Sequence, residues 1–299
     1  MMNSLDCCIL CPRNCKVNRN NGETGFCKAT NKIKIAKYCL HFWEEPCISG
    51  DCGSGTIFFS NCNLKCIYCQ NFEISTKNCG KEISIEDFAN ICISLQQNGA
   101  LNINLVTPTH FIPLIRDGLL LAKKKGLHIP IVYNTSSYET VDSLKMLDGL
   151  IDIYLADLKY YDNKLGEIFS GAKNYFLVAK KAIGEMYRQI GVPKFNGSIM
   201  KKGVIVRHLL LPTHSEDSKK ILAYLHDTYK DNIYISIMNQ YTPIRKIEKY
   251  KELNSKVDDY EYDLLINYAC DIGITNAFIQ EGDTCSESFI PDFGTFSDK

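Results

Sequence analysis

The sequence predicts an α/β fold in which a parallel sheet curls into an incomplete (β/α) barrel. Seven strand-like apolar runs alternate along the 299-residue chain with amphipathic segments that suit helices. Repeated strand–helix units form parallel sheets with right-handed crossovers, and seven strands with five or six helices indicate a barrel that does not close. Polar residues follow most of the runs, at the edge where barrels place their functional groups.

The elements can be placed from their apolar patterns. The strand-like runs span residues 56–60, 103–106, 129–133, 153–156, 204–206, 233–237 and 277–279. The helical segments span residues 84–99, 111–125, 138–148, 172–190, 215–230 and 257–272. In the first of these, Ser84 is expected to cap the helix and Gly99 to end it. Cys92 falls on its apolar face and is expected to be a core residue.

The charge balance limits the kinds of partner. Lys and Arg total 34, as do Asp and Glu, so the formal net charge is zero. Phosphate binding normally needs a basic excess, so no nucleic-acid partner is expected. The start of the chain lacks a basic segment followed by an apolar one, and no apolar run approaches the roughly 20 residues that span a bilayer. We therefore expect no membrane association and a cytoplasmic location.

Cysteine is concentrated in the first quarter of the chain. Eleven of the 15 cysteines precede Gln70, and such usage without a secretory signal favours metal binding or catalysis over disulfides. Cys62, Cys66 and Cys69 follow the first strand-like run with C-x3-C-x2-C spacing. Iron–sulfur clusters are held by thiolates, usually one per iron, so these three could hold a four-iron cube and leave one iron open for chemistry. Spacing alone also allows part of a zinc site.

Four earlier cysteines predict a second metal centre: Cys8, Cys11, Cys15 and Cys27. Closely spaced cysteines with a distant fourth suit a closed four-thiolate site. Such sites serve both zinc and iron–sulfur clusters, so the centre is expected to be either an auxiliary [4Fe-4S] cluster or zinc. Cys7 offers an alternative register with Cys11. The remaining cysteines of this region are expected to be unliganded thiols: Cys39, Cys47 and Cys52.

The pattern C-x3-C-x-aromatic-C, with Tyr68 as the aromatic residue, resembles the signature of the radical S-adenosylmethionine (SAM) superfamily. More narrowly, residues 53–71 resemble relatives of pyruvate formate-lyase activating enzyme that carry an extra cysteine-rich N-terminus. The likeness runs from about Cys8 to Phe293 and includes a C-x2-C-P-x2-C segment and a His-x2-Glu-Glu-Pro stretch at residues 41–46. It implies a partial (β/α)6-type radical SAM barrel over residues 51–299, preceded by a small cysteine-rich metal-binding segment over residues 1–50.

The resemblance implies a SAM pocket at the strand ends, with Cys62, Cys66 and Cys69 as the catalytic cluster ligands. SAM needs a cation for its carboxylate, which a guanidinium can bind bidentately, and polar partners for its ribose. In the resembling enzymes an Asp-x-Lys after the fourth strand and an Arg on the fifth line this pocket. The expected cofactor-binding residues are Tyr68, Thr107, Thr109, Asn134, Asp157, Lys159 and Arg207.

One stretch departs from the family pattern. The Gly-Gly-Glu that many radical SAM enzymes place after the second strand is absent, and residues 106–110 stand there instead. A hydroxyl of Thr107 or Thr109 is expected to take over its hydrogen bond to SAM. His110 and His208, also near strand ends, are open between a catalytic role and a capping or partly buried one.

The resemblance implies a reaction in which a reduced [4Fe-4S] cluster cleaves SAM to methionine and a 5′-deoxyadenosyl radical. That radical is expected to abstract hydrogen from a partner protein or peptide, for example to generate a glycyl radical, with reduced flavodoxin or ferredoxin as the electron donor. Two alternatives stay open: a radical SAM enzyme acting on a small molecule, and a non-catalytic iron–sulfur electron-transfer module. Electron carriers need no polar rim at five strand ends, which weighs against the second alternative.

Overall fold

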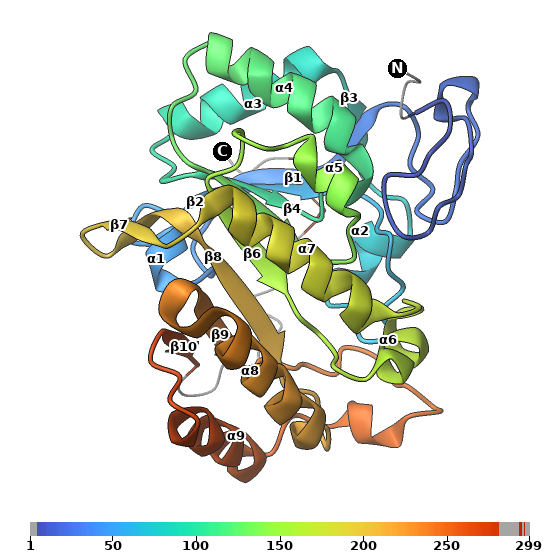
Figure 1. Ribbon diagram of the computed structural model, residues 1–299. Helices are drawn as coiled ribbons and strands as arrows, with labels where there is room; N and C mark the ends of the chain where they lie inside the picture. Colours follow the sequence, from blue (N-terminus) through green and yellow to red (C-terminus); the bar gives the residue numbers. More distant parts are fainter. Residues whose placement is uncertain (1–4, 281–292, 295, 297–299) are drawn as a thin grey trace.

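The computed structural model describes residues 5–280, 293, 294 and 296, and its centre is one ten-stranded sheet (Figure 1). The strand order is β10-β9-β8-β6-β5-β4-β2-β1-β3, with β7 beside β8. Seven neighbouring strands run parallel: β2 (Ser54–Phe59), β4 (Ile103–Val106), β5 (Ile131–Thr135), β6 (Ile153–Asp157), β8 (Ile199–Leu209), β9 (Tyr234–Met238) and β10 (Ala277–Ile279). The mostly parallel α/β fold predicted from the sequence is confirmed.

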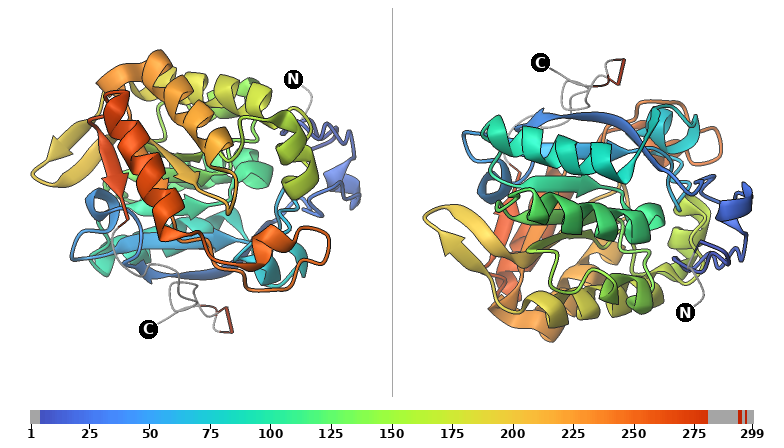
Figure 2. Two further views of the ribbon diagram at one scale, coloured as in Figure 1. Left: turned by 90° about the horizontal axis from the view of Figure 1, so that it is seen from below. Right: turned by 90° about the horizontal axis from the view of Figure 1, so that it is seen from above.

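Larger helices lie on the outer side of the curved sheet (Figure 2). They are α3 (Ile85–Gln97), α4 (Ile112–Lys124), α7 (Tyr175–Ile190), α8 (Ser215–Tyr229) and α9 (Asp259–Asp271). Shorter helices are α1 (Pro46–Ser49), α2 (Phe72–Thr76), α5 (Val141–Lys145) and α6 (Asn163–Ser170), together with four 3-10 turns: η1 (Arg19–Asn21), η2 (Thr109–Phe111), η3 (Lys230–Asn232) and η4 (Lys251–Asn254). No helix in the described part of the chain is both long and apolar enough to cross a bilayer.

The sheet buries both faces, as parallel strands with crossover helices generally do. On β6, Tyr154 and Ala156 pack in the large core under the helices, whereas Ile153 and Leu155 pack in a smaller cluster on the opposite face with Ile48. This alternation follows from the two-residue period of a strand. Cys92 is fully buried in the large core, as its helical position predicts.

Local signals place the helix starts well. Ser84 and Asp87 form a reciprocal capping box at the start of α3. Strand ends are less accurate: β5 begins and ends two residues later than predicted, because Pro130 lacks the amide that a central strand needs. Asn134 and Thr135 therefore belong to the strand, and β8 is much longer than the predicted residues 204–206.

Three antiparallel strands were not predicted from the sequence: β1 (Ile33–His41), β3 (Lys81–Ile83) and β7 (Lys194–Asn196). β1 pairs with β2 on one side and with β3 on the other. Lysines interrupt the apolar residues of β1, so the sequence shows no continuous apolar run at this strand. The predicted division at residue 50 leaves β1 on the N-terminal side even though it belongs to the sheet, and the division itself stays a prediction.

The described residues before β1 form loops with a single 3-10 turn, and they pack against the side of the barrel. The buried Arg19 guanidinium donates to the carbonyl of His110 at 2.5 Å, and the carbonyl of Leu10 accepts from Ser143 Oγ at 2.7 Å. Backbone φ is positive at Asn14, Lys16 and Lys28, each adjacent to a cysteine. Tight turns of this kind let nearby thiols face one another.

Two helical glycines give a test of the helix packing. A Cβ at Gly118 of α4 would overlap Cδ1 of the buried Phe88 on α3, whereas a Cβ at Gly184 of α7 would meet nothing closer than 3.8 Å. Gly118→Ala is expected to lower the free energy of unfolding by about 1–3 kcal/mol through overpacking. Gly184→Ala should raise it by about 1 kcal/mol through helix propensity. Urea unfolding of the two variants measures both, and equal shifts in the same direction would contradict the close packing of α3 on α4.

Candidate active site

A cavity of about 270 Å³ opens at the carboxyl ends of the parallel strands and reaches into the barrel. All three thiols of Cys62, Cys66 and Cys69 line it. Six of the seven predicted cofactor-binding residues also line it: Tyr68, Thr107, Asn134, Asp157, Lys159 and Arg207. The structure thus brings together side chains from five parallel strands or the loops that follow them, in the place where barrels carry function.

The three-thiol loop leaves the sheet at the end of β2 through Asn61, which has a positive φ of 73°. The amide of Leu64 donates to Cys62 Sγ at 3.3 Å, and the amide of Cys69 donates to the carbonyl of Cys66 at 3.2 Å. Two more amides tie the loop to the end of α6: Lys65 donates to the carbonyl of Ser170 and Ile67 to that of Phe169. The loop is therefore held by backbone bonds at several points.

Arg245, in the segment after β9, is a further support that sequence reasoning missed. Its guanidinium donates to the carbonyl of Ile67 at 2.7 and 2.9 Å and to that of Cys66 at 3.4 Å, and it lies 4.2 Å from the ring centre of Phe72. Gln70 bonds the same segment through the carbonyl of Gln240. Arg245 stands in an irregular stretch without a motif, so no sequence signal pointed to it.

The loop presents three cysteines to the cavity, and an iron–sulfur cube takes one thiolate per iron. In the described part of the chain, no three His, Cys, Asp or Glu side chains form a site for a single ion. Burial raises the pKa of Cys62 to about 12 and that of Cys66 to about 11, the latter opposed by Lys159. Metal binding must displace these protons.

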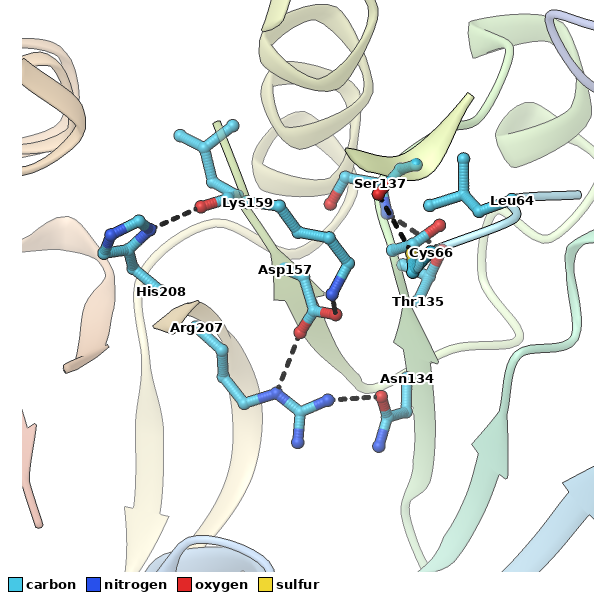
Figure 3. Close-up of polar contacts among 12 residues, drawn as sticks. Leu64, Cys66, Asn134, Thr135, Ser137, Asp157, Lys159, Arg207 and His208 are labelled. Atoms are coloured by element: carbon cyan, nitrogen blue, oxygen red, sulfur yellow. Dashed lines mark hydrogen bonds and ion pairs between the residues drawn. The ribbon is translucent and has the colours of Figure 1, made fainter. Parts of the chain in front are cut away.

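A buried charge network lines the cavity near the loop, and Figure 3 shows Lys159 and Arg207 on either side of Asp157. Lys159 Nζ lies 2.6 Å from Asp157 Oδ2, and Arg207 Nε lies 3.1 Å from Asp157 Oδ1. Burial alone would raise the pKa of Asp157, but these two cations outweigh it and hold the pKa below its usual range. Asp157 is therefore a carboxylate at neutral pH.

Arg207 is more engaged than the sequence suggested. Besides Asp157, it contacts Glu44 Oε2 at 3.1 Å through Nη1 and Asn134 Oδ1 at 2.6 Å through Nη2. These acceptors take three of the five guanidinium N–H donors, which leaves two for a further acceptor such as a SAM carboxylate. Lys159 lies close enough to Cys66 for each of the two residues to shift the pKa of the other.

Glu44 connects the cavity to the segment before α1. Its carboxylate accepts from Asn104 Nδ2 at 2.7 Å and from Asn134 Nδ2 at 3.3 Å, and it lines the cavity together with Trp43 and His41. The structure thus places Glu44 at the cavity, and the neighbouring Glu45 is buried as well.

The two threonines after β4 lie in different surroundings, and only Thr107 lines the cavity. Thr107 lines the cavity and adopts a φ of 60°, which is uncommon for a β-branched residue and is found where structure or function demands it. Thr109 is buried and donates to Glu139 Oε1 at 2.6 Å, outside the cavity. A contact between Thr109 and SAM stays a prediction, and in this structure the Thr109 hydroxyl is bonded to Glu139.

The two histidines near strand ends are buried and lie outside the cavity. His110 Nε2 bonds the carbonyl of Ser60 at 2.8 Å, and burial lowers the pKa of His110 to about 3. His208 bonds the carbonyl of Leu158 and Ser218 Oγ, each at 2.8 Å. Both are neutral at physiological pH and hold strand ends in place.

The N-terminal cysteines lie near one another beside the three-thiol loop. Cys8, Cys11 and Cys27 are buried and Cys15 is half-buried. Burial raises the pKa of Cys27, Arg19 opposes the rise, and the nearby Cys8 and Cys15 add to it. The amide of Phe26 donates to Cys15 Sγ at 3.4 Å. Cys39 and Cys47 are buried elsewhere, in the clusters facing the barrel interior.

An incomplete parallel barrel with a three-thiol loop beside a polar cavity defines an enzyme that holds a metal cluster next to a small cofactor. The model of the radical SAM superfamily matches residues 56–225, more than half of the chain. The chain belongs to the radical SAM superfamily, and membership implies a [4Fe-4S] cluster and SAM.

Two curated relatives and one solved structure extend this result. Uncharacterized protein MJ0674 of Methanocaldococcus jannaschii is 31% identical over 274 residues, covering 88% of this chain and 74% of the relative. Pyruvate formate-lyase-activating enzyme of Clostridium pasteurianum is 25% identical, covering 66% of this chain and 79% of that enzyme. HydG, a maturase of the [FeFe]-hydrogenase, matches with a TM-score of 0.51 at 15% identity over 79% of this chain and 54% of that chain. The likeness to HydG concerns the fold alone, and the chain spans about half its length.

Removing the Arg207 guanidinium tests whether this side chain stabilises the fold in the absence of any cofactor. Arg207→Ala leaves Asp157 and Glu44 buried without this partner, so the free energy of unfolding of the metal-free protein should fall by about 3–5 kcal/mol. Glu44→Gln, which keeps an amide oxygen for Asn104, should cost about 1–2 kcal/mol. Urea unfolding at pH 7 measures both. A wild-type unfolding midpoint for Arg207→Ala would show that the guanidinium does not support the fold.

Proposed function

We propose that this protein is a radical SAM enzyme of the activating-enzyme type that abstracts hydrogen from a partner protein or peptide. The observation that carries the proposal is the placement of the Cys62, Cys66 and Cys69 thiols on one wall of the cavity and the Lys159–Asp157–Arg207 network on another. When bound, the cluster and SAM supply the electron and the carbon radical. The similarity to the activating enzyme of Clostridium pasteurianum supports the type of reaction.

In this proposal, the protein residues bind and orient. The three thiolates hold the cluster, and Lys159 and Arg207 offer positive charge toward the SAM carboxylate, with Asp157 keeping both side chains in place. Asn134, Thr107 and Tyr68 offer the remaining contacts along the cavity. Charged groups already held in place by their partners need little rearrangement when a charged ligand binds.

The opening of the cavity at the strand ends supports a macromolecular substrate. A hydrogen donor on an extended peptide segment can reach the radical through this opening. An enzyme acting on a small molecule remains the second candidate, and a non-catalytic electron carrier has no use for the polar cavity.

We also propose that Cys8, Cys11, Cys15 and Cys27 hold a second metal centre, and that it is an auxiliary iron–sulfur cluster. The Cys27 thiol lies close enough to Cys8, Cys11 and Cys15 to interact with each of them, which supports one shared centre. Donors already face the sulfurs: Arg19 Nη2 lies 3.5 Å from Cys27 Sγ, and the backbone amides of Arg13 and Ala29 bond Cys11 and Cys27. Such N–H donors favour thiolates and are typical around bound clusters.

The proposal extends to the surroundings of the enzyme. Its reductant is a low-potential one-electron carrier such as reduced flavodoxin or ferredoxin, and its location is the cytoplasm, where the low potential that radical SAM chemistry needs is maintained. Asn63 links the two thiol sets, because its side chain bonds Cys11 and its neighbour Cys62 is a cluster ligand. This contact supports a close approach of the two centres.

The proposed reaction can be tested on the anaerobically reconstituted protein. Simultaneous Cys62→Ala, Cys66→Ala and Cys69→Ala substitutions should abolish 5′-deoxyadenosine formation from SAM in the presence of dithionite, because no thiolate would remain to hold the cluster. Cys79→Ala, at an exposed thiol outside both sets, is the matched control. Liquid chromatography with mass detection measures the product. Undiminished production by the triple variant would overturn the proposal.

Metal analysis distinguishes the two forms of the N-terminal centre. The wild-type protein should hold about eight irons, and the Cys11→Ser, Cys27→Ser variant about four. About four irons with one zinc in the wild type would instead identify a structural zinc site. Cys52→Ser, at an exposed connector thiol, should leave both counts unchanged. Unchanged metal content in the double variant would contradict a second centre at these residues.

A further inference from the structure

A chain of three buried hydroxyl groups leads from the cavity wall to one of the cluster thiols. Ser170 Oγ lies 3.0 Å from Cys66 Sγ, Tyr160 OH lies 2.7 Å from Ser170 Oγ, and Tyr68 OH lies 2.5 Å from Tyr160 OH. Ser170 and Tyr160 are fully buried and Tyr68 is nearly so. The chain therefore exchanges no hydrogen bonds with bulk water along its length.

The backbone fixes this chain with respect to the cluster loop. Ser170 is the last residue of α6, and its carbonyl accepts from the amide of Lys65, next to Cys66. The preceding carbonyl, of Phe169, accepts from the amide of Ile67. Because both neighbours of Cys66 are bonded to the end of α6, the Ser170 hydroxyl is held against the sulfur and cannot drift away from it.

A metal-bound Cys66 sets the direction of every proton in the chain. A thiolate has no proton, so it can only accept, and Ser170 must donate to it. The Ser170 oxygen then accepts from Tyr160, and the Tyr160 oxygen accepts from Tyr68. Hydrogen bonds aligned head to tail polarise one another, so the donor that faces the sulfur is stronger than a lone serine.

We propose that Ser170, polarised by Tyr160 and Tyr68, is a positioning residue that raises the reduction potential of the cluster ligated by Cys66. Reduction adds one electron to the cluster, and a donor at a ligand sulfur stabilises that added negative charge. No proton leaves the chain in this step. The inference rests on Cys66 being a cluster ligand, as in the proposed function, but not on the identity of the substrate.

The proposal gives the hydroxyl of Tyr68 a role that its aromatic ring does not explain. A phenylalanine would line the cavity equally well and would pack against Tyr241, whose ring centre is 5.9 Å away. Only the hydroxyl completes the chain. Tyr68→Phe is therefore a substitution that keeps the cavity wall and removes the outermost donor.

A redox titration followed by electron paramagnetic resonance, without SAM, tests the proposal on the reconstituted full chain. All variants carry Cys11→Ser and Cys27→Ser, so that the signal comes from the cluster bound by Cys66 alone. Ser170→Ala should make the cluster at least tenfold harder to reduce, which is about 59 mV more negative for one electron. Tyr160→Phe and Tyr68→Phe should shift the potential in the same direction by successively smaller amounts. Tyr154→Phe removes a hydroxyl on β6 that is bonded to Gln189 of α7, away from the chain of hydroxyls, and should leave the potential unchanged.

The possible results distinguish a failure of the proposed role of Ser170 from a failure of the cluster assignment at Cys66. If Ser170→Ala retains its iron and titrates at the wild-type potential, the proposal is wrong. If Ser170→Ala fails to assemble, Tyr160→Phe decides, because it leaves Ser170 beside the sulfur and a wild-type potential would then overturn the proposal. A wild-type protein without any reducible cluster signal would instead count against the proposed function.

Discussion

The ion-paired network inside the barrel is the constraint on which the cavity depends. Four charged side chains from three separated parts of the chain meet there: Glu44, Asp157, Lys159 and Arg207. Removing an ionised group from water costs several kcal/mol unless it is paired, so each of these residues requires the others. The requirement fixes β6 against β8 and draws the segment before α1 into the barrel interior. As a result, the wall that faces the thiols is polar and rigid before any cofactor binds.

The three-thiol loop depends on contacts from outside its own strand. Arg245 holds its carbonyls from the segment after β9, and the end of α6 holds its amides. On a third side, Arg13 donates to the carbonyls of Asn63 and Gly171, at 2.8 and 2.5 Å. The N-terminal segment therefore supports the cluster loop as well as carrying its own cysteines. A loop of this length would otherwise be mobile, and ligands of a cluster have to be held in a fixed arrangement.

The sequence predicts the parts of this structure that local patterns encode. Apolar runs and caps placed all seven parallel strands, and polar strand ends identified Asp157, Lys159 and Asn134 as cavity residues. Thr109 lies outside the cavity because its strand-end hydroxyl turns toward the buried Glu139, which only the packing reveals. Arg245 and β1 were missed for a related reason. Their positions are set by partners distant in the chain, and neither the charge of an isolated arginine nor a strand interrupted by lysines carries a local signal.

The support of the loop by Arg245 has a consequence for the order of events in the cell. Cys66 and Arg245 are separated by 179 residues, so a ribosome completes the cysteines long before the side chain that holds their carbonyls. At typical synthesis rates this interval lasts about 10–35 s. During that time the loop lacks the hydrogen bonds from Arg245, and its thiols can react with free metal ions and oxidants. Insertion of a cluster into the finished geometry is thus a late step, which has to wait until about four-fifths of the chain has been made.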